Sequence, residues 1–239
     1  MKLELRSLVT AAGESIAALD YEPRRPRGVS LAVGHGYSSS KHNLDLLCAF
    51  LASHGFGIIS IDFPGHKLGA SGGRLREVAD LDRALDAAVR YAREAYGGVI
   101  YTLGHSMGAA TALRVCAADA AVAGAISIAT GYRRPSALEA LGSRGAIDLR
   151  SAYVDGLTLP ELVAESEPLL PGALARLEGR SVLYVAAEHD AMVSRASAEE
   201  LFALAPEPKT FVTIASDHTY AGEHARAAVL AWLNERHPR

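Results

Sequence analysis

Ser106 stands between two glycines in residues 104–108, which read Gly-His-Ser-Met-Gly. Residues 99–103 form a short apolar run that predicts a buried strand, and residues 109–116 have the composition of a helix with small residues at its start. A strand that turns into a helix through Gly-x-Ser-x-Gly is a nucleophile elbow, because so tight a turn leaves no room for Cβ atoms on either side of the serine. We therefore expect the Ser106 Oγ to be exposed at a helix N-terminus and available as a nucleophile.

A nucleophilic serine needs a histidine base, and the base needs a carboxylate that fixes its tautomer. For this elbow both residues follow the serine in the chain, in the order serine, acid, histidine. His218 lies in the loop after the predicted strand 210–214, and Asp190 lies in the loop after the predicted strand 181–186. Glu188 and Asp217 are rivals of Asp190, although Asp217 adjoins His218 and adjacent side chains usually diverge. We predict the set Ser106, Asp190 and His218.

Such a site also needs backbone N–H groups that face the developing oxyanion. The loop Gly34-His35-Gly36-Tyr37 follows the predicted strand 29–33, so the N–H groups of Tyr37 and Met107 are the candidates. We interpret His35 and His105 as structural residues that support these turns. The remaining histidines share no metal-ligand spacing, and we expect neither a metal nor a cofactor. The serines at 38–40 near glycines lack the Gly-x-x-x-x-Gly-Lys-Ser/Thr pattern of a phosphate loop.

Strand and helix patterns alternate along the chain and predict one α/β domain over residues 1–239, with a mostly parallel eight-stranded sheet covered by helices on both faces. Residues 3–10 and 15–21 predict an initial antiparallel pair. The other expected strands are residues 29–33, 57–61, 99–103, 125–128, 181–186 and 210–214. The clearest helical patterns span about residues 43–54, 77–96 and 222–236.

The alternation fails only between Gly131 and Gly179, a segment with prolines and weak amphipathic pieces such as residues 157–163. It is too long for a plain connection, so we expect a small cap over the site. Two readings of its side chains stay open, a substrate pocket or the cap's own core. The candidate substrate-binding residues are Tyr132, Tyr153, Leu157 and Met192. The arginines of this segment, which either attract an acidic substrate or form a solvated face, are Arg133, Arg134, Arg144 and Arg150.

Composition narrows the class of protein. The 239 residues carry a formal net charge of −3 with interspersed signs, so no basic stripe for nucleic acid or polybasic membrane patch is evident. The N-terminus has no apolar signal core, and no apolar run reaches the roughly 18 residues of a membrane span, which predicts a soluble cytoplasmic protein. Cys48 and Cys116 lie in helical patterns and are expected to be buried free thiols. The expected partners are a small-molecule ester and water.

Taken together, the motifs resemble those of the α/β-hydrolase superfamily from the first strand to the last helix. They are His35-Gly36-Tyr37, Asp62-Phe63-Pro64-Gly65-His66, residues 104–108, the 188–190 loop and Asp217-His218-Thr219-Tyr220. Within the superfamily the chain is similar to small bacterial carboxylesterases of the feruloyl or cinnamoyl esterase and serine aminopeptidase S33-like type. The usual motif of these esterases, Asp-x-x-Gly-His-Gly-x-Ser-x-Gly, is interrupted here by Lys67 and Leu68. This departure affects the loop beside the acyl pocket.

The resemblance implies hydrolysis of a carboxylic ester through an acyl-enzyme on Ser106. The 131–179 segment contains no long, continuous apolar helix that would suit an interfacial lid, so we expect small or aromatic acyl groups. The same three residues also serve thioesterases, amidases or peptidases and carbon–carbon bond hydrolases, because bond specificity resides in the cap and pocket. A ligand receptor that keeps a hydrolase pocket with little turnover is a further alternative. A serine nucleophile is inconsistent with haloalkane dehalogenase chemistry, which uses aspartate at this position.

Overall fold

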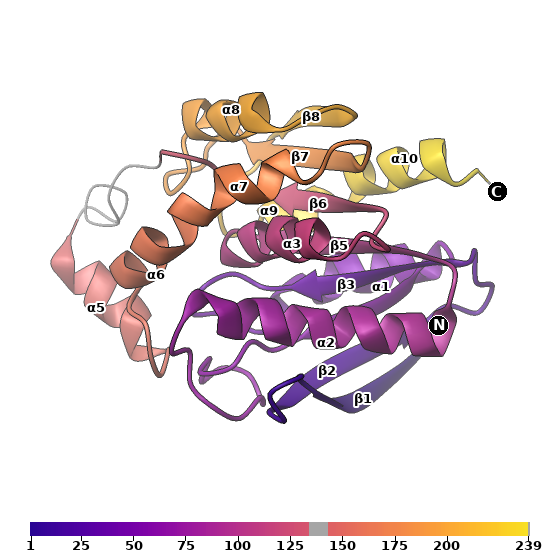
Figure 1. The fold of residues 1–239 in the computed structure, drawn as a ribbon, viewed down its shortest axis with the longest axis horizontal. Coiled ribbons are helices and arrows are strands. Elements are labelled where there is room, and N and C mark those ends of the chain that lie inside the picture. Colours follow the sequence, from indigo (N-terminus) through magenta and orange to yellow (C-terminus); the bar gives the residue numbers. More distant parts are fainter. Residues whose placement is uncertain (134–142, 239) are drawn as a thin grey trace.

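A computed structural model of the chain describes residues 1–133 and 143–238. Its centre is an eight-stranded sheet in the order β1-β2-β4-β3-β5-β6-β7-β8 (Figure 1). The strands are β1 (Lys2–Val9), β2 (Ser15–Glu22), β3 (Val29–Gly34), β4 (Gly57–Ile61), β5 (Val99–His105), β6 (Gly124–Ile128), β7 (Ser181–Ala187) and β8 (Lys209–Ile214). β2 pairs antiparallel with β1 and with β4, and all other pairs are parallel. The predicted mostly parallel sheet and its initial antiparallel pair are confirmed.

Helices cover both faces of the sheet, as the buried apolar strands require. One face is packed by α2 (Val78–Tyr96), α3 (Met107–Ala118), α7 (Leu170–Ala175) and α8 (Arg195–Leu204). The other face is packed by α1 (Asp45–Ser53), α9 (Ala221–His224) and α10 (Arg226–Arg236). The helix expected at 43–54 begins with a short 3-10 turn, η1 (Lys41–Leu44), and the one expected at 222–236 is divided into α9 and α10. Both cysteines are buried free thiols, as predicted.

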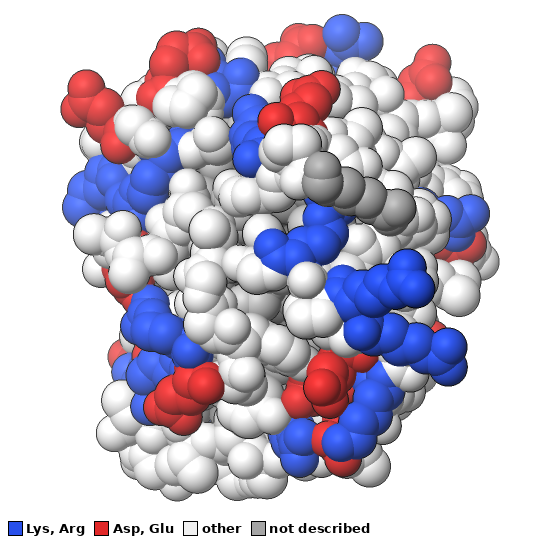
Figure 2. All heavy atoms as spheres, turned by 90° about the vertical axis from the view of Figure 1, so that its right-hand side faces the viewer, with Lys and Arg blue, Asp and Glu red and all other residues white. Residues whose placement is uncertain are grey.

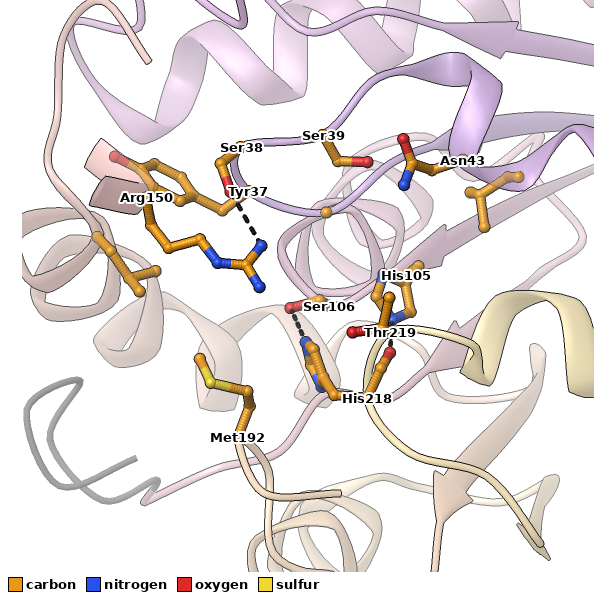
Figure 3. A pocket seen from close by; sticks show the side chains of 13 residues that line it. Tyr37, Ser38, Ser39, Asn43, His105, Ser106, Arg150, Met192, His218 and Thr219 are labelled. Atoms are coloured by element: carbon orange, nitrogen blue, oxygen red, sulfur yellow. Dashed lines mark hydrogen bonds between the residues drawn. The ribbon is translucent and has the colours of Figure 1, made fainter. Parts of the chain in front are cut away.

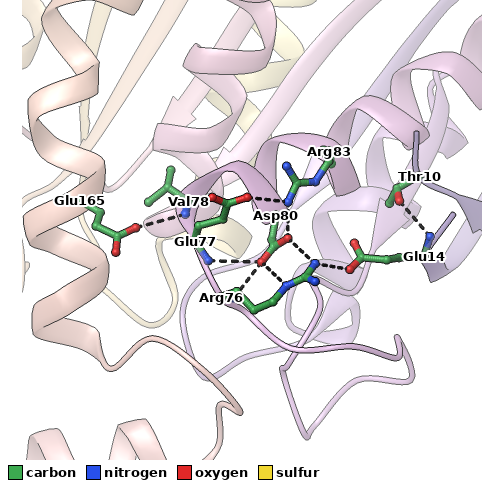
Figure 4. A network of polar contacts seen from close by, with 8 residues as sticks. All are labelled: Thr10, Glu14, Arg76, Glu77, Val78, Asp80, Arg83 and Glu165. Atoms are coloured by element: carbon green, nitrogen blue, oxygen red, sulfur yellow. Dashed lines mark hydrogen bonds and ion pairs between the residues drawn. The ribbon is translucent and has the colours of Figure 1, made fainter. Parts of the chain in front are cut away.

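The start of α2 ties three parts of the fold together (Figure 4). Asp80 is fully buried, and its carboxylate accepts hydrogen bonds from the backbone N–H groups of Arg76 and Glu77. The bond from Glu77, the N-cap residue, is part of a capping box. Burial alone would raise the pKa of Asp80, but the hydrogen bonds from Arg76 and Arg83 outweigh it and lower that pKa. Arg76 also pairs with Glu14 in the β1–β2 turn. The helix is thereby held against both the sheet edge and the loop that precedes it.

The segment between β6 and β7 divides into two parts. α5 (Arg144–Ala152) and α6 (Leu159–Ser166) lie beyond the carboxyl ends of the parallel strands, where a cap is expected (Figure 1). Residues 170–177 pack differently, because Leu170, Leu174 and Leu177 are fully buried in the core beside α3. Part of the 131–179 segment predicted as a cap therefore belongs to the layer that covers the sheet. Residues 134–142, which include Arg134, lie outside the described residues.

The end of the molecule opposite the cap carries Lys, Arg, Asp and Glu side chains of both signs interspersed with uncharged residues (Figure 2). Mixed charges of this kind create no extended field of one sign. Within residues 1–133 and 143–238, no helix combines the length and the apolar character needed to cross a membrane.

Candidate active site

Ser106 occupies the sharp turn between β5 and α3. Its backbone φ is +53°, in the left-handed region that a non-glycine residue rarely adopts and that costs on the order of 1–3 kcal/mol. The surrounding structure holds this conformation, since the Ser106 N–H donates to the carbonyl of Ile128 at 2.8 Å. Ser106 is also the N-cap residue of α3, so its side chain lies at the positive end of that helix.

The two glycines of the elbow are required by close backbone contacts. A methyl group at Gly104 would lie 2.0 Å from the carbonyl oxygen of Gly108, and one at Gly108 would lie 2.2 Å from the carbonyl oxygen of Gly34. Both distances are far below van der Waals contact. The helix α3 therefore approaches β3 and β5 as closely as backbone atoms allow, which is the reason for the Gly-x-Ser-x-Gly spacing.

The structure brings Ser106, His218 and Asp190 together in one chain of hydrogen bonds. The Ser106 hydroxyl lies 3.1 Å from His218 Nε2, and His218 Nδ1 lies 2.8 Å from Asp190 Oδ2. The Asp190 carboxylate is 1% exposed, whereas the His218 side chain is 19% exposed. With Nδ1 as donor to the buried carboxylate, Nε2 is free to accept the serine proton.

The two rival acids occupy other positions. Glu188 is exposed, and the structure records its backbone N–H as a donor to Ile214 at the end of β8. Asp217 is also exposed, and its Oδ1 accepts a hydrogen bond from the N–H of Tyr220 at 2.9 Å. Asp190 is the carboxylate that reaches the ring of His218.

The loop after β3 passes directly beside the nucleophile. A methyl group at Gly36 would lie 3.5 Å from the Cβ of Ser106 and 3.0 Å from Nδ1 of His105. The next N–H along this loop belongs to Tyr37. Met107 is the first residue of α3, so its N–H has no partner within the helix. The two N–H groups predicted for an oxyanion hole are thus carried by segments that flank Ser106.

His35 and His105 support the two turns. His35 Nε2 accepts the N–H of Phe63 at 3.0 Å, and Nδ1 donates to the carbonyl of Gly36 at 2.7 Å. Burial and the neighbouring His66 lower the pKa of His35 to about 3. His105 Nε2 donates to the backbone carbonyl of His218 at 2.7 Å, and burial lowers the pKa of His105 to about 4. Both rings are neutral hydrogen-bonding groups, as the structural interpretation predicts.

A cavity of about 90 Å³ opens above Ser106. Figure 3 shows its labelled side chains arranged around the serine, with His218 and Met192 on one side and the loop that follows β3 on the other. The lining residues are Gly36, Tyr37, Ser38, Ser39, Asn43, Leu44, His105, Ser106, Arg150, Leu159, Met192, His218 and Thr219. The cavity is therefore built from the loop that follows β3, from η1, α5 and α6, and from the loops that carry Asp190 and His218.

Comparison with known proteins now identifies the family. Residues 24–161 match the family described as serine aminopeptidase, S33. The chain belongs to this α/β-hydrolase family. No curated protein sequence matches the chain significantly.

Solved structures share the fold of this S33-family hydrolase. An esterase domain from Rhodothermus marinus superposes with a TM-score of 0.73 and 20% identity, over 98% of this chain and 99% of that one. A Pyrococcus furiosus esterase gives a TM-score of 0.69 and 18% identity, over 98% and 90% of the two chains. The thioesterase domain from the curacin biosynthetic pathway gives 0.67 and 16%, over 98% and 99%. At these identities the likeness establishes the fold alone.

Of the four substrate-binding residues predicted from the sequence, one lines the cavity of this S33-family hydrolase. Met192 lines it, but Tyr132, Tyr153 and Leu157 are not among its lining residues. Tyr132 and Leu157 pack against the core below, and Tyr153 is 41% exposed at the end of α5. For Tyr132 and Leu157, a packing role describes their positions better, whereas the exposed Tyr153 fits neither the pocket nor a core.

Of the two residues that interrupt the usual motif after β4, Lys67 contacts the end of α5. The Lys67 N–H donates to the carbonyl of Tyr153 at 2.9 Å, and its Nζ donates to the carbonyl of Ala152 at 2.8 Å. Leu68 is exposed. Lys67 therefore satisfies carbonyls at the end of α5, where a helix lacks internal partners. Through these bonds Lys67 connects the loop after β4 to the C-terminal end of α5.

Several lining residues were not selected from the sequence. Ser38 and Ser39 directly follow Tyr37, so their place in the chain was a usable signal once Tyr37 was assigned to the oxyanion loop. Leu159 comes from α6, whose orientation over the sheet no local pattern specifies. Arg150 belongs to the arginines for which attraction of an acidic substrate and a solvated face both stayed open, and among the described ones it is the arginine that lines the cavity. Among the described residues, no group of three or more His, Cys, Asp or Glu side chains lies close enough to hold a metal ion.

Proposed function

We propose that this protein is a serine hydrolase that cleaves a small or aromatic carboxylic ester through an acyl-enzyme on Ser106. The observation that carries the proposal is the chain of hydrogen bonds from Ser106 through His218 to the buried Asp190. These bonds join a strained serine, a part-exposed histidine and a buried carboxylate in one line. Acyl transfer requires this arrangement, because the serine must lose a proton as it attacks.

In this mechanism His218 Nε2 removes the proton of the Ser106 hydroxyl while the oxygen attacks the carbonyl carbon. The N–H groups of Tyr37 and Met107 stabilise the oxyanion of the tetrahedral intermediate, assisted by the positive end of α3. When the intermediate collapses, His218 gives its proton to the departing alcohol and the acyl group stays on Ser106. In the second half of the reaction, His218 removes a proton from a water molecule, which attacks the acyl-enzyme. The carboxylic acid is released, and His218 returns the proton to Ser106. Asp190 stabilises the positive charge that His218 carries between these steps.

The preference for compact acyl groups is supported by the size and lining of the cavity. The cavity has a volume of about 90 Å³, and its lining includes the apolar side chains of Leu44, Leu159 and Met192. The described cap helices α5 and α6 are short, at 9 and 8 residues, and neither offers the long apolar surface of an interfacial lid.

Covalent labelling tests the nucleophile. A fluorophosphonate should modify the protein at Ser106, and Ser106→Ala should abolish both labelling and hydrolysis of p-nitrophenyl acetate, because an unactivated serine does not react. Ser53→Ala, which alters an exposed serine at the end of α1, is the matched control and should keep both. Turnover that survives in a pure Ser106→Ala preparation would refute the mechanism. Labelling without turnover of any ester would favour the receptor alternative.

The acyl preference is tested with p-nitrophenyl esters of two to sixteen carbons and with methyl ferulate. We expect kcat/KM to be highest for short or aromatic acyl groups. A maximum at twelve carbons or beyond would contradict this part of the proposal. A matched ester, thioester and amide series then distinguishes the other bond types that the same three residues can cleave.

A further inference from the structure

Arg150 extends from α5 into the cavity above Ser106. Figure 3 shows its guanidinium directed toward the serine, between the loop that carries Tyr37 and Ser38 and the side of the cavity formed by His218. Its Nη1 donates a hydrogen bond to the Ser38 hydroxyl at 3.3 Å. Among the described residues that line the cavity, Arg150 is the only one with a permanent charge.

The packing of α5 sets where Arg150 stands beside the cavity. Ile147, three residues earlier and on the same side of the helix, is buried and anchors that face. The helix begins at the N-cap Ser143, whose hydroxyl accepts the N–H of Ala146, and its last carbonyls accept from Lys67. Contacts at both ends of α5 therefore hold this short helix in place, with Arg150 beside the cavity.

The charge of Arg150 is not balanced by a carboxylate in the described part of the chain. Its recorded side-chain contact is the neutral hydroxyl of Ser38. Other arginines of the fold differ, since Arg76 and Arg83 pair with the buried Asp80, and the buried Arg114 pairs with Asp82. Ser38 therefore uses one of the five guanidinium N–H groups, and no other partner of the Arg150 guanidinium is recorded among the described residues.

The neighbouring side chains add neutral hydrogen-bonding groups on the same side of the cavity. Ser38 and Ser39 present hydroxyl groups and Asn43 presents an amide, as Figure 3 shows, and no carboxylate is among the described lining residues. A planar guanidinium surrounded by neutral donors favours a carboxylate, which it can bind through two parallel hydrogen bonds.

We propose that Arg150 is a specificity-determining residue, which binds a carboxylate on the substrate itself. The preferred substrates are then monoesters of dicarboxylic acids, or esters of similar geometry, with the free carboxylate on Arg150 and the scissile carbonyl at Ser106. This inference rests on the proposed serine hydrolase function and names the substrate class of the same cavity. The carboxylate keeps its charge throughout, so the acyl-transfer steps are unchanged.

The test compares monomethyl adipate with the methyl ester of its monoamide, which has the same shape without the charge. We expect the wild-type kcat/KM to be roughly fivefold to tenfold higher for the anionic ester. A charge-assisted hydrogen bond is worth about tenfold or more, and the exposure of Arg150 to solvent reduces this toward the roughly fivefold of an exposed ion pair. Arg150→Ala should reduce this ratio to near 1, and Arg150→Lys should keep part of it. Arg144→Ala, on the same helix but outside the cavity lining, is the matched control and should leave the ratio unchanged.

A second measurement uses the wild-type protein alone and does not depend on how a variant folds. The preference for the anionic ester should decrease when NaCl is raised from 0.05 to 0.5 M, because salt screens a partly exposed charge pair. A wild-type ratio near 1 would overturn the inference. So would an equal loss on both esters in Arg150→Ala, which would indicate a role in the step common to all esters. Turnover of either ester by Ser106→Ala would instead contradict the proposed function.

Discussion

Asp190 uses its two carboxylate oxygens for different tasks. Oδ2 accepts the hydrogen bond from His218, while Oδ1 accepts the backbone N–H groups of Met192 and Val193, each at 2.8 Å. The backbone donors fix the rotation of the carboxylate, so the second oxygen is held in the direction of the imidazole. The loop after β7 thus positions the acid through its own backbone.

This arrangement predicts a large effect of Asp190→Asn. The two N–H groups need an acceptor, so the amide oxygen takes the position of Oδ1 and the amide NH₂ faces His218 Nδ1. The imidazole must then carry its proton on Nε2, where it cannot accept the proton of Ser106. We expect kcat for an activated ester to fall about 10³- to 10⁴-fold with the protein still folded.

Asp217→Asn is the matched control, because Asp217 is an exposed carboxylate adjacent to the same histidine. It should change kcat less than about threefold, in the range of ordinary surface substitutions. Circular dichroism and a steady-state assay on both variants check the pair. A larger loss in Asp217→Asn than in Asp190→Asn would assign the acid to Asp217.

The sequence predicts the position of a functional residue when that residue directly follows a strand. Ser106, Asp190 and His218 each stand just after a parallel strand, and the carboxyl ends of such strands meet at one edge of the sheet. Arg150 has no such marker. It reaches the cavity because α5 lies across that edge, and the sequence of a cap helix does not specify its direction.

Among the elements, α3 sets the geometry of the site through its contact with β3. Gly108 is within the helix, where glycine ordinarily costs stability relative to alanine, yet a methyl group there would meet the carbonyl of Gly34 at 2.2 Å. The carbonyl belongs to the sheet backbone and cannot rotate away. The helix and the strand must therefore separate if any side chain is added.

We predict that Gly108→Ala destabilises the protein by roughly 1–3 kcal/mol or more, the usual range for overpacking a core, and displaces the elbow. Gly145→Ala is the matched control, because Gly145 is also helical but a methyl group there meets nothing within 4 Å. It should be neutral or stabilise by up to about 1 kcal/mol. Urea unfolding of both variants measures the difference, and equal stabilities would show that β3 and α3 can move apart freely.

The cap shows why element boundaries are easier to predict than element placement. The amphipathic piece expected at 157–163 becomes α6 over Leu159–Ser166, a shift of a few residues. The position of the following helix, α7, depends on the packing of Leu170 and Leu174 against α3. This contact joins segments that are far apart in the chain. Local periodicity indicates which face of a helix is apolar, but it does not say which surface that face covers.

For the whole molecule, three buried histidines link stability to pH. Burial lowers the pKa of His66 to about 4, His105 has a pKa of about 4, and His35 has a pKa of about 3. Each is neutral in the folded protein over a range in which an unfolded histidine, with a pKa of about 6.5, binds a proton. The unfolded state therefore binds more protons below pH 6.5, so these groups make the folded protein less stable as pH falls.

The free energy of unfolding should accordingly decrease as pH falls from about 6.5 to 4.5, with each such histidine contributing at most about 1.4 kcal/mol per pH unit. Above pH 6.5 the contribution is fully retained. His66→Phe keeps a ring against His35 and Phe63 but removes one titrating group, so it should flatten the slope by up to that amount. The same substitution at the exposed His42 should leave the slope unchanged. Urea unfolding at several pH values measures the slopes, and an unchanged slope in His66→Phe would show that His66 does not stay neutral in the folded protein.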